Sequence, residues 1–219
     1  MHALKDDYTL MLQAIKEAGA IAKKFQDEGY ERLEDKGEGD PFLTEADIAV
    51  DTHLREVLTT ARPDYGWLSE ETEKDTSYLT AKRSWVVDPI DGTRDFVEGT
   101  GQFAVSVGLI EAGQPIAGAV FNPMRDQLIS AYKNGGVYLN GAPCGPKKEV
   151  SLEDATCLIS VSEDRKNLWD KYKDKLNTKP TGSVAYKLAL VGAGTARSGG
   201  RGEGIVGHLP TPAAGGGLD

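Results

Sequence analysis

The sequence predicts an α+β protein in which helices flank a β-rich centre. Apolar residues recur at steps of three and four from Leu4 to Phe25, as on one face of an amphipathic helix. Between residues 102 and 132, apolar runs rich in strand-forming residues are separated by turn residues, which is typical of an antiparallel meander. Apolar residues make up 39% of the 219 residues, enough for a sizeable core.

The first half of the chain is expected to alternate helices with short strands. The first helix ends near Gly29, and the polar, glycine-rich segment 33–42 predicts a loop. Thr44 is a candidate cap for a second helix. The segment 65–71 (YGWLSEE) predicts a short strand that leads into two acids, and 84–88 (SWVVD) predicts a buried strand.

The second half is expected to close the meander and then to form a smaller α/β unit. The segment 139–143 (LNGAP) predicts a hairpin turn. Beyond a polar stretch we expect a strand at 156–161, a helix at 163–176 and a helix at 182–194 capped by Ser183. The glycine- and proline-rich segment after Gly192 has no helical or strand period, which predicts disorder. The expected organisation is an N-terminal domain at 1–145, a partial C-terminal domain at 146–196, and an aberrant, disordered tail at 197–219.

The charge balance argues against a nucleic-acid polymer as partner. The chain carries 34 acids and 25 bases, a net charge of −9, whereas nucleic-acid binding needs a basic face. A small phosphate ester is not excluded, because a bound cation can invert the local charge. Cys144 and Cys157 show no metal or redox spacing and are expected to be reduced thiols. We see no signal peptide and no apolar run long enough to span a membrane, so we expect a cytoplasmic protein.

Four acids, Asp47, Glu70, Asp88 and Asp91, stand at predicted strand ends or helix starts. Each has a structural explanation when taken alone. Asp47 follows Thr44 by three residues and would complete a capping box, and Glu70 would be a solvated surface acid. Asp88 would form a turn at the strand end, and Asp91 would cap the helix after Gly92. Taken together, however, unpaired carboxylates this close repel one another unless something neutralises them.

A divalent cation would neutralise the acids of the segment WVVDPIDGT. Mg²⁺ prefers hard oxygen ligands, usually one or two carboxylates together with waters and substrate phosphate. Pro89 restricts the backbone, so that Asp88, the carbonyl of Ile90 and Asp91 can point into one small volume. The amides of Gly92 and Thr93 can then hold a phosphate at the start of the next helix.

The segment DPIDGTRDF (88–96) resembles the Asp-Pro-Ile-Asp-Gly-Thr signature of the inositol monophosphatase family. TEAD (44–47) is similar to the family's upstream Thr-x-x-Asp element, and LSEE (68–71) to its Gly-Glu-Glu element, with serine in place of glycine. Lys36 stands at the spacing of the family's active-site lysine, and 182–194 is similar to its later Gly-Ser helix. The resemblance covers residues 1 to about 196.

The resemblance implies a layered α/β/α/β/α sandwich and a Mg²⁺-dependent, lithium-sensitive phosphomonoesterase. Carried over by position, it implies Glu70, Asp88 and the Ile90 carbonyl as ligands of a first Mg²⁺, and Asp88 and Asp91 as ligands of a second. Thr93, hydrogen-bonded to Asp47, would orient and deprotonate the attacking water, and Glu70 would help to place a further metal or its water. The substrate-binding residues implied are Lys36, Asp91, Gly92 and Thr93.

The C-terminal part departs from the family pattern. The family's last metal-binding aspartate, in a Trp-Asp element after the Gly-Ser helix, has no counterpart here. Residues 203–209 and 214–218 can be encoded so that a one-base shift restores Trp-Asp and Glu-Ala-Gly, and we interpret the tail as a frameshifted product. The resemblance leaves inositol 1-phosphate and adenosine 3′,5′-bisphosphate open as substrates, and histidinol phosphate and fructose bisphosphate as well. Because the family's last metal-binding aspartate is missing, we expect the catalytic activity of this chain to be impaired. The alternative function is a catalytically impaired metal- and phosphate-binding member with a binding or regulatory role. A homodimer would fit either.

Overall fold

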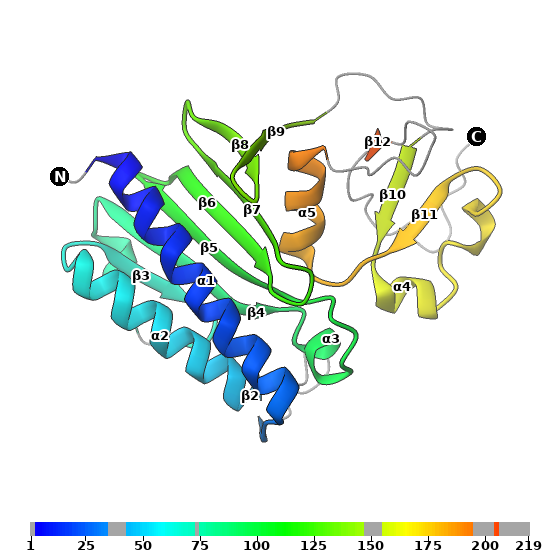
Figure 1. The fold of residues 1–219 in the computed structure, drawn as a ribbon, viewed down its shortest axis with the longest axis horizontal. Helices are drawn as coiled ribbons and strands as arrows, with labels where there is room; N and C mark the ends of the chain where they lie inside the picture. Colours follow the sequence, from blue (N-terminus) through cyan, green and yellow to red (C-terminus); the bar gives the residue numbers. More distant parts are fainter. Residues whose placement is uncertain (1–2, 35–42, 73–74, 147–154, 195–203, 206–219) are drawn as a thin grey trace.

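A seven-stranded mixed sheet forms the centre of the computed structural model, which describes residues 3–34, 43–72, 75–146, 155–194 and 204–205 (Figure 1). Its strands lie in the order β3 (Gly66–Ser69), β4 (Arg83–Asp91), β5 (Ala104–Glu111), β6 (Gln114–Asn122), β7 (Gln127–Tyr132), β8 (Gly136–Leu139) and β9 (Ala142–Cys144). β3 and β4 are parallel, whereas every later neighbour pair is antiparallel. The predicted meander is confirmed, and so is its hairpin turn, where Asn140 and Gly141 both have positive φ.

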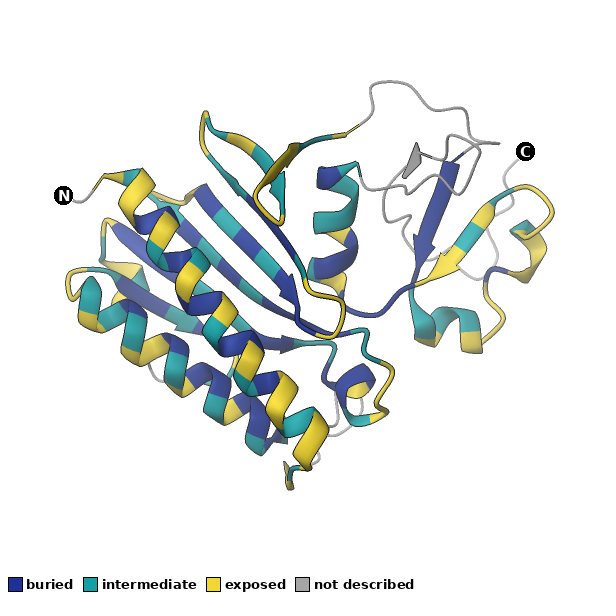
Figure 2. Ribbon diagram, in the orientation of Figure 1, coloured by how far each residue is buried: buried dark blue, intermediate teal, exposed yellow. Residues whose placement is uncertain are grey.

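Two helices cover one face of this sheet, and one helix covers the other. α1 (Leu4–Glu28) and α2 (Glu45–Ala61) lie side by side on the first face, as Figure 1 shows. Their buried apolar residues pack with the inward side chains of the sheet, which alternate along β5 as Val105, Val107 and Leu109. α5 (Val184–Ala193) covers the second face and buries Tyr186. In Figure 2 the central strands are banded dark blue and teal, because buried residues alternate with half-buried ones along β5 and β6.

A second, smaller sheet lies on the far side of α5 (Figure 1). It consists of β11 (Asn177–Pro180), β10 (Ala155–Ile159) and β12 (Gly204–Ile205), in that order and all parallel. The layers α1/α2, large sheet, α5 and small sheet therefore follow one another, which confirms the α+β class and the layered arrangement. β12 is the described part of the segment 197–219 for which we expected disorder; the rest of that segment lies outside the described residues.

The predicted helix at 163–176 is wrong. The chain forms only α4 (Val161–Arg165) and a 3₁₀ turn at Asp170–Tyr172. Asn167 has φ 57°, a left-handed conformation that an α-helix does not contain. Trp169 is buried between the two pieces and donates its Nε1 hydrogen to Glu163 over 3.0 Å. Burial of this one aromatic ring bends a segment whose other residues are mostly charged.

The remaining short elements complete the first half of the chain. β1 (Arg32–Glu34) and β2 (Leu43–Thr44) form an antiparallel pair, a 3₁₀ turn covers Ser77–Leu79, and α3 spans Thr93–Val97. In the described part of the chain, no helix is at once long enough and apolar enough to cross a lipid bilayer.

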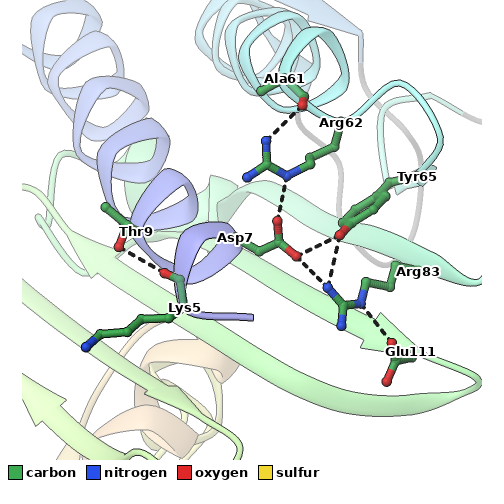
Figure 3. Close-up of polar contacts among 8 residues, drawn as sticks. All are labelled: Lys5, Asp7, Thr9, Ala61, Arg62, Tyr65, Arg83 and Glu111. Carbon is green, nitrogen blue, oxygen red and sulfur yellow. Dashed lines mark hydrogen bonds and ion pairs between the residues drawn. The ribbon is translucent and has the colours of Figure 1, made fainter. Parts of the chain in front are cut away.

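A buried ionic cluster fastens the start of α1 to the sheet and to the end of α2 (Figure 3). Asp7 is fully buried, and its carboxylate accepts hydrogen bonds from Arg62 Nε over 2.6 Å, Arg83 Nη1 over 2.7 Å and the Tyr65 hydroxyl over 2.7 Å. Arg83 also donates its Nε hydrogen to Glu111 over 2.9 Å. The Asp7 carboxylate joins α1, residues 62–65 and β4, and Arg83 extends the cluster to Glu111.

Close packing of α1 on the sheet predicts opposite effects for two glycine substitutions. A Cβ at Gly19 would lie 2.4 Å from the ring of Phe121, which is itself buried, whereas a Cβ at Gly192 in α5 would meet no atom within 4 Å. We expect Gly19→Ala to lower the free energy of unfolding by about 1–3 kcal/mol through overpacking. Gly192→Ala should raise it by up to about 1 kcal/mol, since alanine is the better helix former. Urea unfolding of both variants tests this, and equal shifts would contradict it.

Candidate active site

A β-bulge in β4 brings the two aspartates of DPID to the same side of the sheet. Asp88 pairs with Ser106 and Asp91 with Ala104, so three steps along β4 oppose two along β5. Residues three apart in a regular strand point to opposite faces, but one extra residue restores the same face. Pro89 lies within this bulge, where its missing N–H interrupts no regular ladder.

The parallel pairing of β3 with β4 places two further acids at the same end of the sheet. Ser69, the last residue of β3, pairs with Val87, so Glu70 and Glu71 follow β3 where Asp88 follows on β4. Asp51 on α2 holds the turn that carries them, because its carboxylate accepts hydrogen bonds from the hydroxyls of Ser69 and Thr72. The serine that replaces the family's glycine therefore has a structural role.

Asp88 is the most strongly perturbed acid of this group. Its Oδ1 atom is buried and has no hydrogen-bond partner among the described residues. Burial, together with the charges of Asp91, Glu70, Asp47 and Glu71, raises the pKa of Asp88 to about 8. A half-buried carboxylate with a buried oxygen and four other acids near it is stable as an anion only beside a positive charge.

Asp47 occupies the capping position that the sequence allows. Thr44 and Asp47 form a complete capping box at the start of α2, in which Asp47 Oδ2 accepts hydrogen bonds from the Thr44 amide over 2.9 Å and the Thr44 hydroxyl over 2.5 Å. Burial raises the pKa of Asp47 to about 6, although the hydrogen bonds from Thr44 act in the opposite direction. The capping role does not remove Asp47 from the acidic group, since its charge acts on Asp88.

Thr93 makes a different hydrogen bond from the one that the resemblance implied. Its hydroxyl donates to the carbonyl oxygen of Ile90 over 3.1 Å, and both residues are buried. Because a hydroxyl has one hydrogen to give, the expected bond from Thr93 to Asp47 is not formed in this structure. The carbonyl of Ile90 keeps a second lone pair for another partner.

Asp91 does not cap α3 but contacts the start of α5, which corrects our structural alternative for this residue; the N-cap of α5 is Ser183, as predicted. Its Oδ2 atom accepts hydrogen bonds from the Ser183 hydroxyl and the Ala185 amide, each over 2.5 Å. The N-cap of α3 is Gly92, whose φ of 94° would strain any other residue and which makes no side-chain cap. A Cβ at Gly92 would lie 3.3 Å from the Ser183 amide nitrogen, so the two halves of the chain meet closely here.

The donor set fits a hard divalent cation that keeps part of its water shell. Asp88, Asp91 and Glu70 supply carboxylates, Ile90 supplies a carbonyl, and the unpartnered Oδ1 of Asp88 lacks a positive partner. Among the described residues, no three His, Cys, Asp or Glu side chains converge tightly enough to enclose an ion by themselves.

Two lysines are relevant to the site, Lys36 and Lys187. Lys36 lies outside the described residues. Lys187 on α5 was missed by the sequence analysis; it is only 3% exposed and forms no ion pair with any described residue. Burial lowers its pKa, and the charges of Glu163, Asp91 and Asp95 act in the opposite direction. A lysine within the otherwise apolar run VAYKLALVGA was the signal that could have found it.

Comparison of the sequence with known proteins shows which family the chain belongs to. The model of the inositol monophosphatase family matches residues 4–202. The chain belongs to the inositol monophosphatase family. It is 34% identical over 194 residues to the inositol-1-monophosphatase of Rhizobium meliloti, covering 84% of this chain and 72% of that protein.

Solved structures agree with the inositol monophosphatase assignment. The extragenic suppressor protein suhB from Bartonella henselae superposes with a TM-score of 0.71 at 27% identity, over 83% of this chain and 72% of that one. A staphylococcal inositol monophosphatase-1 in a LiCl-soaked inhibitory complex gives 0.74 at 19% identity, over 87% and 72%, which shows the fold alone. The resemblance seen in the sequence is confirmed: the chain is a phosphatase of the inositol monophosphatase family, whose members depend on metal ions.

Proposed function

We propose that this protein is a Mg²⁺-dependent phosphomonoesterase that hydrolyses a small phosphate ester with a metal-activated water. The observation that supports this most directly is Asp88, a half-buried carboxylate whose buried Oδ1 atom has no hydrogen-bond partner among the described residues and which lies among four other acids. Glu70, Asp88, the Ile90 carbonyl and Asp91 would hold the cation. Bound Mg²⁺ supplies charge for the phosphoryl oxygens and lowers the pKa of a coordinated water.

The side chains around that position have separate roles in the proposal. Asp91 links the cation side to the start of α5 through Ser183, so substrate contacts from the C-terminal part are tied to β4. The amides of Gly92 and Thr93 would donate to the phosphate; α3 has only five residues, so its dipole adds little. Thr93 and Asp47 would orient the attacking water and take its proton, which requires the Thr93 hydroxyl to turn away from Ile90.

Phosphate release from a substrate panel tests the function. The panel contains inositol 1-phosphate and adenosine 3′,5′-bisphosphate, with Mg²⁺, with EDTA, and with Mg²⁺ plus Li⁺. We expect Mg²⁺-dependent release that Li⁺ inhibits, and the preferred ester identifies the substrate. Metal binding by calorimetry without release of phosphate from any ester would instead support the impaired, binding-only alternative that the divergent 197–219 segment suggests. Release that is equal in Mg²⁺ and EDTA would exclude the proposed mechanism.

Partners and location follow from the same proposal. We propose a small phosphate ester as the partner and Mg²⁺ as the cofactor. The proposed location is the cytoplasm, and we expect neither a membrane nor a nucleic-acid polymer as a partner. The net charge of −9 supports the absence of nucleic acid. We propose domains at 1–145 and 146–196 that share the site across the contact of Asp91 with Ser183, and a homodimer as the assembly; sedimentation at several protein concentrations tests the dimer.

Thr93 offers a separate test of water activation. Thr93→Ala should retain cation binding, because the threonine side chain is not a proposed ligand, and should lower kcat by about 100-fold or more, the usual loss for an acid–base partner. Thr93→Ser keeps the hydroxyl and should recover most of that loss. Steady-state kinetics of both variants, with a Mg²⁺ titration of each, gives the comparison. Near-normal turnover of Thr93→Ala would leave Asp47 as a capping residue only.

A further inference from the structure

A groove of about 540 Å³ lies between α1 and the β7–β8 hairpin. None of its lining residues belongs to the acidic group around Asp88. Tyr8 on α1 forms its floor together with Ser130 on β7, and the two hydroxyls are 2.7 Å apart. A cavity of this size is within the range that small-molecule sites occupy.

One wall of the groove is a stripe of α1 that carries two lysines. Lys5, Thr9, Leu12 and Lys16 line it and are spaced as neighbours on a single helix face. Both lysines are exposed, and neither forms an ion pair with a described residue. Asp126 is the single carboxylate in the lining, so the groove carries a positive balance in a protein whose net charge is −9. This local charge favours an anion.

The other wall is aromatic at one end. The ring of Tyr132 lies 4.6 Å from that of Tyr8 and is parallel to that of Tyr138, with 6.3 Å between the last two centroids. The ring of Tyr132 is held in place, since a Cβ on Gly135 would lie only 2.0 Å from it. Lys5 is one turn from Tyr8 on the helix, so a cation and preset aromatic rings stand together at this end.

We propose that this groove binds an anionic metabolite with a planar ring, of the size of a mononucleotide. The ring packs on Tyr132 and Tyr138, and the anionic group pairs with Lys5. Leu12 and Leu128 supply further apolar surface along the groove. A rigid aromatic wall beside an ammonium group recognises the combination of ring and anion better than either part alone.

Calorimetric titration of the full chain with AMP in EDTA tests the proposal. Without a divalent cation the acidic group of the active site repels phosphate, so heat reports on other sites. We expect saturable binding with Kd on the order of 0.1–1 mM. Inorganic phosphate and adenosine, titrated separately, should each bind at least about tenfold more weakly than AMP.

Two variants and a matched control decide the location. Lys5→Glu and Tyr138→Ala should each weaken AMP binding about tenfold, since an ion pair or a stacked ring is lost. Lys24→Glu makes the same charge change on α1 at a residue outside the groove lining and should leave AMP binding unchanged. Absence of saturable heat in the wild type would overturn the proposal. So would equal losses in Lys5→Glu and Lys24→Glu, or phosphate binding as tight as that of AMP.

Discussion

Asp88→Asn is expected to lower phosphate release by at least about 100-fold, the scale on which loss of one transition-state charge contact acts. Asparagine keeps the shape of the side chain but removes the negative charge that the cation requires. In Mg²⁺ titrations the variant should show no saturable heat at the concentrations that saturate the wild type. Asp64→Asn, at an exposed aspartate in the turn after α2, is the matched control and should behave as wild type in both assays.

The same substitution should stabilise the protein when no cation is present. Burial and neighbouring acids raise the pKa of Asp88 from 3.8 to about 8 in the folded state. A group whose pKa is raised on folding favours the folded state most at low pH, and that contribution is lost as pH rises towards the folded pKa. The wild type in EDTA should therefore lose stability between about pH 4 and pH 8 through Asp88, while Asp88→Asn does not.

Thermal unfolding at several pH values in EDTA measures this difference. The Tm of Asp88→Asn should exceed that of the wild type by a margin that grows from pH 5 to pH 8, and saturating Mg²⁺ should reverse the order. A margin that is constant with pH would show that the pKa of Asp88 is not raised in the folded protein. Higher stability together with lost activity is the expected behaviour of a site built from mutually repelling groups.

The sequence was sufficient to place the acids, because their positions follow from the strands that carry them. Two hydrophobic runs that each end in acids predict carboxylates at one edge of a sheet, and β3 and β4 deliver them there. What a single sequence does not contain is the bulge between Asp88 and Asp91, which decides that both point the same way. Bulges depend on pairing with a neighbouring strand, and the partner residues Ser106 and Ala104 carry no local signal.

The hydrogen-bond and ion-pair partners that lie far away in the sequence could not be predicted from the sequence either. Asp91 binds Ser183, which lies 92 positions later, and its carboxylate contacts the start of α5 instead of capping α3. Asp7 and Arg83 lie 76 positions apart, and in the amphipathic pattern of α1 Asp7 had no feature that separated it from exposed Asp6. Charged residues read as solvent-facing unless the fold supplies a buried partner.

Asp7→Ala is expected to cause a larger loss of stability than Gly19→Ala or any substitution in the acidic group around Asp88. It removes the carboxylate that Arg62 and Arg83 share and leaves the buried guanidinium group of Arg83 and the partly buried one of Arg62 without it (Figure 3). Breaking a buried ion pair by removing one partner costs about 3–5 kcal/mol. For a chain of 219 residues this corresponds to a fall in Tm of roughly 10 °C.

Asp6→Ala is the matched control, because it removes the same charge from the adjacent, exposed position of α1 and should change stability by at most about 0.5 kcal/mol. Differential scanning calorimetry of both variants gives the comparison, and phosphate release measured well below the lower Tm should be equal in the two. The cluster is expected to act on stability alone, since Asp7 does not belong to the acidic group around Asp88. A Tm for Asp7→Ala within about 2 °C of that for Asp6→Ala, less than about 1 kcal/mol, would show that the two arginines find other partners and that the cluster does not hold α1 to the sheet.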